Sequence, residues 1–99
     1  YRVRIFEDEN EKMNLSLPQV GGEILSISQF TLYADCKKGN RPSFSLAGER
    51  HHAEKMYLYF NEYMRSLGLK VDEGIFGADM KVRLLNDGPV TIILDSSEW

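Results

Sequence analysis

The sequence predicts an α+β fold in which a largely antiparallel or mixed β-sheet packs against one long amphipathic helix. One stretch near the middle of the chain has apolar residues at the three- and four-residue spacing of a helical face. Shorter alternating or apolar runs lie before and after it, and turn residues separate them. Strands, then a single helix, then strands again is the order expected of an α+β domain.

Three strands are expected before the helix. Residues 2–6 alternate between charged and apolar side chains, and residues 13–17 form a second short run that ends at Pro18. Residues 24–33 form the strongest predicted strand, because β-branched, aromatic and leucine side chains fill most of it. This strand is apolar on both faces, so we expect it to be central in the sheet and covered on both sides.

The helix is expected at residues 46–67, with Gly68 as the glycine that ends it. Its predicted core face consists of Ala53, Met56, Tyr57, Phe60, Met64 and Leu67. Further strands are expected after the helix, at residues 70–76, 80–84 and 90–94.

Composition places the chain among ordinary globular domains. It has 99 residues, of which 42% are hydrophobic and 27% charged, with a formal net charge of −3. We interpret residues 1–99 as a single domain. A chain with net negative charge needs a local basic patch to contact nucleic acid.

The single cysteine and the lack of targeting segments indicate the cellular compartment of the protein. Cys36 has no partner for an internal disulfide, which is typical of a reducing compartment. No signal peptide or membrane-spanning apolar run is present, so we expect a cytoplasmic protein without membrane contact. The chain starts at Tyr1, directly inside an alternating run, and we therefore expect that an N-terminal segment of the domain is missing.

The sequence lacks the motifs of the common hydrolases and metalloenzymes. It has no G-x-S-x-G motif, and its histidines, His51 and His52, lie near the start of the expected helix. One cysteine and two adjacent histidines do not have the spacing of a zinc site. No phosphate-binding loop or dinucleotide fingerprint occurs either. We therefore expect no metal and no cofactor.

Two segments are unusual. Ser28-Gln29-Phe30-Thr31 places polar side chains in a strand expected to be buried, where each must find a hydrogen-bond partner. The simpler interpretation is that neighbouring backbone satisfies them. Asn86-Asp87-Gly88-Pro89 has ordinary turn chemistry, and a turn without further role is the simpler interpretation there. Neither segment decides a function alone.

Together with further motifs, these segments resemble the D-aminoacyl-tRNA deacylase family. Ser28-Gln29-Phe30-Thr31 is followed by Leu32-Tyr33-Ala34-Asp35 and, after a basic loop, by Arg41-Pro42-Ser43-Phe44. Phe76-Gly77-Ala78-Asp79-Met80 leads into Asn86-Asp87-Gly88-Pro89-Val90-Thr91. Arg4-Ile5-Phe6-Glu7-Asp8 and Met13-Asn14-Leu15-Ser16-Leu17 also match, in the family's order. The resemblance covers essentially the whole chain and implies a barrel-like sheet that lacks its N-terminal portion.

The resemblance implies an enzyme of chiral proofreading that hydrolyses the ester of D-aminoacyl-tRNA and of glycyl-tRNA. It implies a homodimer in which Ser28–Thr31 of one subunit faces a cis Gly88–Pro89 bond of the other. A rigid wall of main chain there would reject an L-amino acid, whose Cβ would collide with it. Catalysis would be assisted by the 2′-hydroxyl of the terminal adenosine, with the N–H of Phe30 or Thr31 as the oxyanion contact.

The same resemblance assigns the site residues. The catalytic segment would be Ser28, Gln29, Phe30 and Thr31. Substrate-binding positions would be Asn86, Gly88, Pro89, Phe76, Gly77, Ala78 and Met80. For Phe76 and Met80, ordinary core packing is an equal alternative. Contacts to tRNA phosphates would come from Lys37, Lys38 and Arg41, for which a solvated basic loop is an equal alternative.

Three other functions remain open at this point. The chain could be a non-catalytic module that binds RNA or a nucleotide with the same fold. It could be a general esterase in which Thr31 is the nucleophile, which would leave a covalent acyl-enzyme. It could also be an interaction domain without a site, although this does not explain why the two unusual segments occur together.

Overall fold

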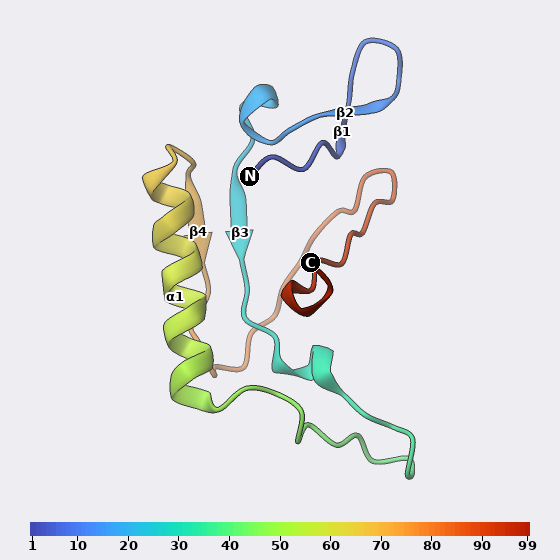
Figure 1. Ribbon diagram of the computed structural model, residues 1–99, viewed down its shortest axis with the longest axis vertical. Coiled ribbons are helices and arrows are strands. Elements are labelled where there is room, and N and C mark those ends of the chain that lie inside the picture. The colour runs from blue at the N-terminus through green and yellow to red at the C-terminus, as the bar shows by residue number, and fades with distance from the viewer.

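The computed structural model describes residues 1–99 and contains one α-helix, short strands and 3₁₀ turns (Figure 1). The strands are β1 (Phe6–Glu7), β2 (Met13–Leu15), β3 (Ile24–Ser26) and β4 (Val71–Glu73). The 3₁₀ turns are η1 (Pro18–Val20), η2 (Phe30–Tyr33) and η3 (Ser96–Glu98), and the helix is α1 (Arg50–Ser66). The predicted α+β class is therefore confirmed.

Two separate strand pairs take the place of one sheet. β1 pairs antiparallel with β2, and β3 pairs parallel with β4 in a register that runs from Ile24 opposite Val71 to Ser26 opposite Glu73. The sequence predicts a largely antiparallel or mixed sheet: the pairing is mixed, with one antiparallel and one parallel pair, but the strands do not form one sheet. The barrel-like arrangement is wrong for this chain, because neither pair is closed and closure needs a continuous ring of strands.

Several predicted strands are shorter than expected or do not form. The run at residues 24–33 is a strand only as far as Ser26, and residues 80–84 and 90–94 pair with no strand. A strand needs a neighbouring edge for its N–H and C=O groups, and β3 has a neighbour on one side only. The expectation that residues 24–33 are covered on both faces is also wrong, since Leu25 is 60% exposed.

Local chemistry explains where α1 begins and ends. The helix starts at Arg50, later than predicted, because the Glu49 carboxylate caps it and accepts hydrogen bonds from the N–H groups of His51 and His52 at 2.9 and 3.0 Å. It ends at Ser66, and Gly68 follows in the left-handed region with φ 92°. The predicted role of Gly68 at the end of the helix agrees with this geometry.

The helix lies along the β3–β4 pair and is attached to it mainly by polar contacts (Figure 1). Asn61 Nδ2 donates to Glu73 Oε2 at 2.7 Å, and Arg65 Nη2 donates to the carbonyl of Val71 at 2.7 Å. The Tyr57 hydroxyl reaches the carbonyl of Ser26 at 2.7 Å. The helix therefore holds both strands of the parallel pair in place.

Very little of the chain is buried. Only four of the 99 residues are buried, namely Val71, Ser16, Ser26 and Asn61, and of these Asn61 alone is fully inaccessible. The predicted core face of the helix is only partly covered, because two strands are too narrow to cover it. Ala53, Tyr57 and Met64 are half-buried, but Met56 and Phe60 remain exposed. None of the helical segments could cross a lipid bilayer.

Candidate functional site

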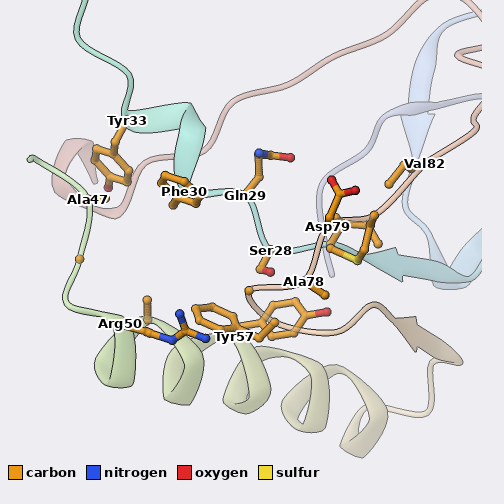
Figure 2. A pocket seen from close by; sticks show the side chains of 16 residues that line it. Ser28, Gln29, Phe30, Tyr33, Ala47, Arg50, Tyr57, Ala78, Asp79 and Val82 are labelled. Carbon is orange, nitrogen blue, oxygen red and sulfur yellow. The ribbon is translucent and has the colours of Figure 1, made fainter. Parts of the chain in front are cut away.

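The candidate site opens where β3 and β4 separate. The last hydrogen bond between the two strands joins the N–H of Gly74 to the carbonyl of Ser26 at 3.3 Å. The Tyr57 hydroxyl joins the same two groups, donating to Ser26 at 2.7 Å and accepting from Gly74 at 3.2 Å. Beyond this point the chain that follows β3 and the chain that follows β4 diverge, and side chains from both face the space between them (Figure 2).

A cavity of about 820 Å³ occupies this space. Its size is within the usual range of ligand pockets, roughly 300–1,000 Å³. Ser28, Gln29 and Phe30 line it from the β3 side, and residues 76–80 line it from the β4 side. The helix contributes Arg50 and Tyr57 (Figure 2), and also Ala53. Most of the lining is apolar, with a small number of polar groups, which is typical of a site for a small organic ligand or a nucleotide.

The structure thus brings together seven of the residues predicted from the sequence, with Gly77 among them. The residues that line one cavity are Ser28, Gln29, Phe30, Phe76, Gly77, Ala78 and Met80. The Phe76 ring lies 6.0 Å from the Tyr57 ring between centroids, and the Met80 sulfur packs over Gly74. Phe76 and Met80 are half-buried wall residues, and their side chains contribute to packing and to the cavity surface at once.

The segment after β3 is a turn and not a buried strand. Ser28 is half-buried, whereas Gln29, Phe30 and Thr31 are exposed. The Gln29 amide hydrogen-bonds the Thr31 hydroxyl, and Thr31 does not line the cavity. The N–H groups of Phe30 and Thr31 donate no hydrogen bond within the chain, because η2 begins here and no carbonyl precedes them in the right position. The polar groups expected to be buried are therefore accessible.

Residues 86–91 form a turn away from the cavity. Asn86 Oδ1 accepts from the N–H of Val90 at 2.9 Å, and Asn86 Nδ2 donates to the Thr91 hydroxyl at 3.3 Å. The Gly88–Pro89 bond is cis, as the resemblance implied. Asn86, Gly88 and Pro89 do not line the cavity of their own chain. Their contribution to a site across a subunit interface stays a prediction.

The basic loop also lies outside the cavity. A bridge between Asp35 and Ser43 closes it, with reciprocal backbone hydrogen bonds of 2.8 and 2.9 Å. Lys37, Lys38 and Arg41 are exposed and form no salt bridge. Lys37 borders a second hollow of about 430 Å³ next to Leu46. Contact of this loop with tRNA stays a prediction.

No histidine lies beside the Ser28–Thr31 segment, and the Asp79 carboxylate is the one acidic side chain of the cavity lining. His51 and His52 are exposed on α1 and do not line the cavity, and the side-chain hydrogen bond of the Thr31 hydroxyl is with the Gln29 amide, which cannot accept a proton. No group of three or more His, Cys, Asp or Glu side chains converges on a position that could hold a metal ion.

One carboxyl with a perturbed pKa lies next to the cavity, at the start of α1. The backbone N–H of His51, and then that of His52, holds the pKa of Glu49 below its ordinary value. Each oxygen of the Glu49 carboxylate accepts one of these hydrogen bonds. Glu49 itself does not line the cavity. The first turn of the helix is thus capped by its own chain.

A sequence profile of the D-Tyr-tRNA(Tyr) deacylase family matches residues 1–95. The chain belongs to this family. It is 64% identical over 96 residues to a D-aminoacyl-tRNA deacylase from Bifidobacterium animalis subsp. lactis and 56% identical over 96 residues to one from Halothermothrix orenii. Each match covers 97% of this chain, but 60% of the first relative and 64% of the second.

A solved structure has a similar fold. It is named c-Myc DNA Unwinding Element Binding Protein, and it superposes with a TM-score of 0.83 at 44% sequence identity. The match covers 96% of this chain and 65% of that chain. The chain therefore spans about 60% of the length of the curated relatives that it matches, and 65% of the length of the protein in the solved structure.

Sequence reasoning on this family member missed the part of the site that comes from the helix. Tyr57 was assigned to the helix core, and Arg50 had no predicted role, yet both line the cavity. The available signal was the order strand, helix, strand at residues 24–73. Parallel strands need a crossover, usually a helix, and ligands bind beyond the carboxyl ends of such strands. Recognising that crossover would have pointed to the first turn of α1.

Proposed function

We propose that this chain forms part of the site of an enzyme that hydrolyses the ester bond of D-aminoacyl-tRNA and releases the free D-amino acid and tRNA. The observation that carries the proposal is the cavity between Ser28–Phe30 and residues 76–80, in a chain that belongs to the deacylase family. The enzyme would remove wrongly charged D-amino acids, and glycine, before translation uses them. We place this activity in the cytoplasm, where aminoacyl-tRNA is made.

The chemistry of the lining suits the end of a tRNA. Proteins recognise single-stranded RNA by stacking its bases on aromatic side chains, and Phe30, Phe76 and Tyr57 supply such rings around the cavity. Polar side chains at Ser28 and Gln29 could hydrogen-bond the ribose that carries the ester. The cavity volume of about 820 Å³ accommodates a nucleoside with a small attached group.

The mechanism that fits this site uses the substrate's own hydroxyl. A threonine hydroxyl is a weak nucleophile without a base, and Thr31 lies outside the cavity wall. The 2′-hydroxyl of the terminal adenosine, by contrast, adjoins the scissile ester, where it would help to activate the water molecule that attacks the ester carbonyl, and the ribose oxygen of the tRNA would leave with a proton. The free N–H groups of Phe30 and Thr31 are available to stabilise the developing oxyanion. An aminoacyl ester is already reactive, so positioning and one oxyanion contact would suffice.

We also propose a homodimer in which the turn at Gly88–Pro89 faces the partner's cavity. That turn does not reach the cavity of its own chain, so it is free to contact another. Large apolar side chains such as Leu85 and Ile93 on the same segment are almost fully exposed, and a partner surface would cover them. Main chain at this position would exclude the Cβ of an L-amino acid but leave room for an α-hydrogen.

The test uses the full-length protein with matched D-tyrosyl-tRNA and L-tyrosyl-tRNA. We expect rapid loss of the D-form while the L-form persists, measured as release of the labelled amino acid. Comparable rates for the two forms would contradict the stereochemical part of the proposal. A protein that is fully active as a monomer in sedimentation would contradict the dimeric part.

A nucleic-acid-binding module without catalysis is the second candidate. The name of the solved protein, which is 44% identical to this chain, refers to binding of a DNA element. Such a module would use the same cavity and basic loop but would leave the ester intact. Tight binding of deacylated tRNA, combined with no turnover of D-tyrosyl-tRNA, would favour this candidate over the enzyme.

A further inference from the structure

Arg50 is the cation of the cavity wall. It is the first residue of α1, and its side chain lines the cavity (Figure 2), as do Phe76 and Gly77. The other charged residue of the lining is Asp79, which Figure 2 shows on the opposite side of the cavity. The guanidinium of Arg50 donates no hydrogen bond and forms no salt bridge in the chain, unlike that of Arg65, which contacts Glu62 and Glu73.

The main chain at Gly77 makes room for this guanidinium. A Cβ atom built on Gly77 would lie 2.8 Å from Arg50 Nη2, which is closer than real Cβ contacts. Gly77 also has φ 77°, in the region that favours glycine. The guanidinium therefore lies against the main chain of Gly77 at the edge of the cavity, within reach of a ligand bound there.

The neighbouring carboxylates leave Arg50 available. Glu49 precedes it in the chain, but both oxygens of Glu49 accept hydrogen bonds from helix N–H groups at 2.9 and 3.0 Å. Asp79 makes no salt bridge with Arg50. An unpaired guanidinium beside aromatic rings matches an anionic aromatic ligand, because its planar fork binds phosphate through two parallel hydrogen bonds.

We propose that Arg50 binds the phosphate on the 5′ side of the terminal nucleotide of aminoacyl-tRNA, and this inference rests on the function proposed above. That nucleotide carries its phosphate on one side of the ribose and the aminoacyl ester on the other. Holding the phosphate at the first turn of α1 leaves the ribose free to extend toward Ser28 and Gln29. Arg50 is thus a positioning residue: it contacts a part of the substrate that does not react.

The first test measures nucleotide binding to the full-length protein by titration calorimetry, with AMP and adenosine as probes. The wild type should bind AMP about ten-fold more tightly than adenosine, as expected for a hydrogen-bonded charge pair. Arg50→Gln should abolish this preference without changing the affinity for adenosine. Arg50→Lys should keep part of it, because lysine retains the charge but not the planar fork.

Lys55→Gln is the matched control. Lys55 is exposed on the same helix, outside the cavity, and its loss changes the net charge by the same amount. This variant should keep the wild-type preference for AMP. Equal affinities of the wild type for AMP and adenosine, or an equal effect of Lys55→Gln and Arg50→Gln, would overturn the assignment.

The second test measures deacylation of D-tyrosyl-tRNA. Arg50→Gln should raise KM by about ten-fold and leave kcat nearly unchanged, which is the signature of binding that is equal in the ground and transition states. The slope of log KM against log salt should fall by about one, the value for one lost phosphate contact. An unchanged KM and slope would overturn the role of Arg50 without affecting the proposed function. Failure to hydrolyse the substrate would instead overturn the function, and the AMP preference would still decide whether Arg50 binds phosphate.

Discussion

The unit formed by β3, α1 and β4 differs from residues 80–95 in how its backbone is satisfied. In the first region, strand hydrogen bonds and the side chains of Tyr57, Asn61 and Arg65 hold the two strands and the helix together. In the second region, no backbone–backbone hydrogen bond involves residues 80–94, and Leu84 and Ile93 are exposed. Both regions have sequence patterns typical of strands.

The difference shows that an alternating sequence pattern determines which side chains share one face of a strand but not which other strand pairs with it. β3 and β4 find each other because α1 brings their ends together, and the helix then covers one side of the pair. Residues 80–84 and 90–94 have no such neighbour within the chain. Their exposed apolar side chains are suited to contact with another protein surface. Such a contact could stabilise this region, whereas hydrogen bonds within the chain stabilise the first region.

The largest expected effect is on the rate of hydrolysis. It tests whether the segment after β3 supplies a catalytic side chain or only part of a cavity that positions the substrate. A substrate whose terminal adenosine lacks the 2′-hydroxyl should be hydrolysed about 10²–10⁴-fold more slowly, because it lacks the group proposed to assist proton transfer from the attacking water. Thr31→Ala should lose about ten-fold at most, since one hydrogen bond is removed. Single-turnover rates measure both defects. The opposite ordering, with an acyl adduct on Thr31, would establish side-chain nucleophilic catalysis.

The next effect tests the attachment of the helix in the ordered region. Tyr57→Phe removes the hydroxyl that joins the carbonyl of Ser26 to the N–H of Gly74. The free energy of unfolding should fall by about 1–2 kcal/mol, measured by urea denaturation. Tyr63→Phe is the control, because the Tyr63 hydroxyl on the same helix makes no hydrogen bond. Equal stability of the two variants would mean that Tyr57 does not tie the strands together.

A smaller effect on stability is expected in the second region. Asn86→Ala removes the acceptor for the N–H of Val90 in an exposed turn, where water can replace it. The free energy of unfolding should change by about 0.5 kcal/mol or less. Deacylation should nevertheless fall several-fold if this turn faces the partner's cavity. Unchanged activity of Asn86→Ala would show that the turn has no part in the site, and the contrast between the two regions would then be purely structural.

The smallest effect concerns pH. The N–H groups of His51 and His52 hold the pKa of Glu49 lower in the folded chain than in the unfolded one. A carboxyl of this kind stabilises the fold above its unfolded pKa, and this contribution is lost as pH falls through its folded pKa. Glu49→Gln should therefore lower Tm slightly at neutral pH, and the two proteins should converge in acid.

Thermal unfolding followed from neutral pH to roughly pH 3 would measure this convergence. Glu9→Gln is a suitable control, because Glu9 is exposed and its side chain accepts no hydrogen bond in the chain. A Tm difference between wild type and Glu49→Gln that persists unchanged into acid would contradict the capping role of the carboxylate.

Local features were predictable from the sequence, and non-local ones were not. The helix and its end at Gly68 follow from residue spacing and from glycine's conformational freedom, both of which are read within a few turns of chain. The strand at residues 24–33 was predicted too long, because its length depends on β4, which lies far away in the sequence. The same holds for residues 80–84 and 90–94, whose partners cannot be read from their own composition.

The sequence by itself determined the family and two walls of the candidate site, because the motifs around Ser28 and Phe76 are contiguous runs of residues. Only the tertiary structure decided that the first turns of α1 form the third wall, with Arg50 and Tyr57 in it. Which side chains of a helix face a cavity depends on where the helix lies relative to the strands. For this chain the Tyr57, Asn61 and Arg65 side chains set that placement through hydrogen bonds to β3 and β4, and the Tyr57 hydroxyl joins groups that are distant in the sequence.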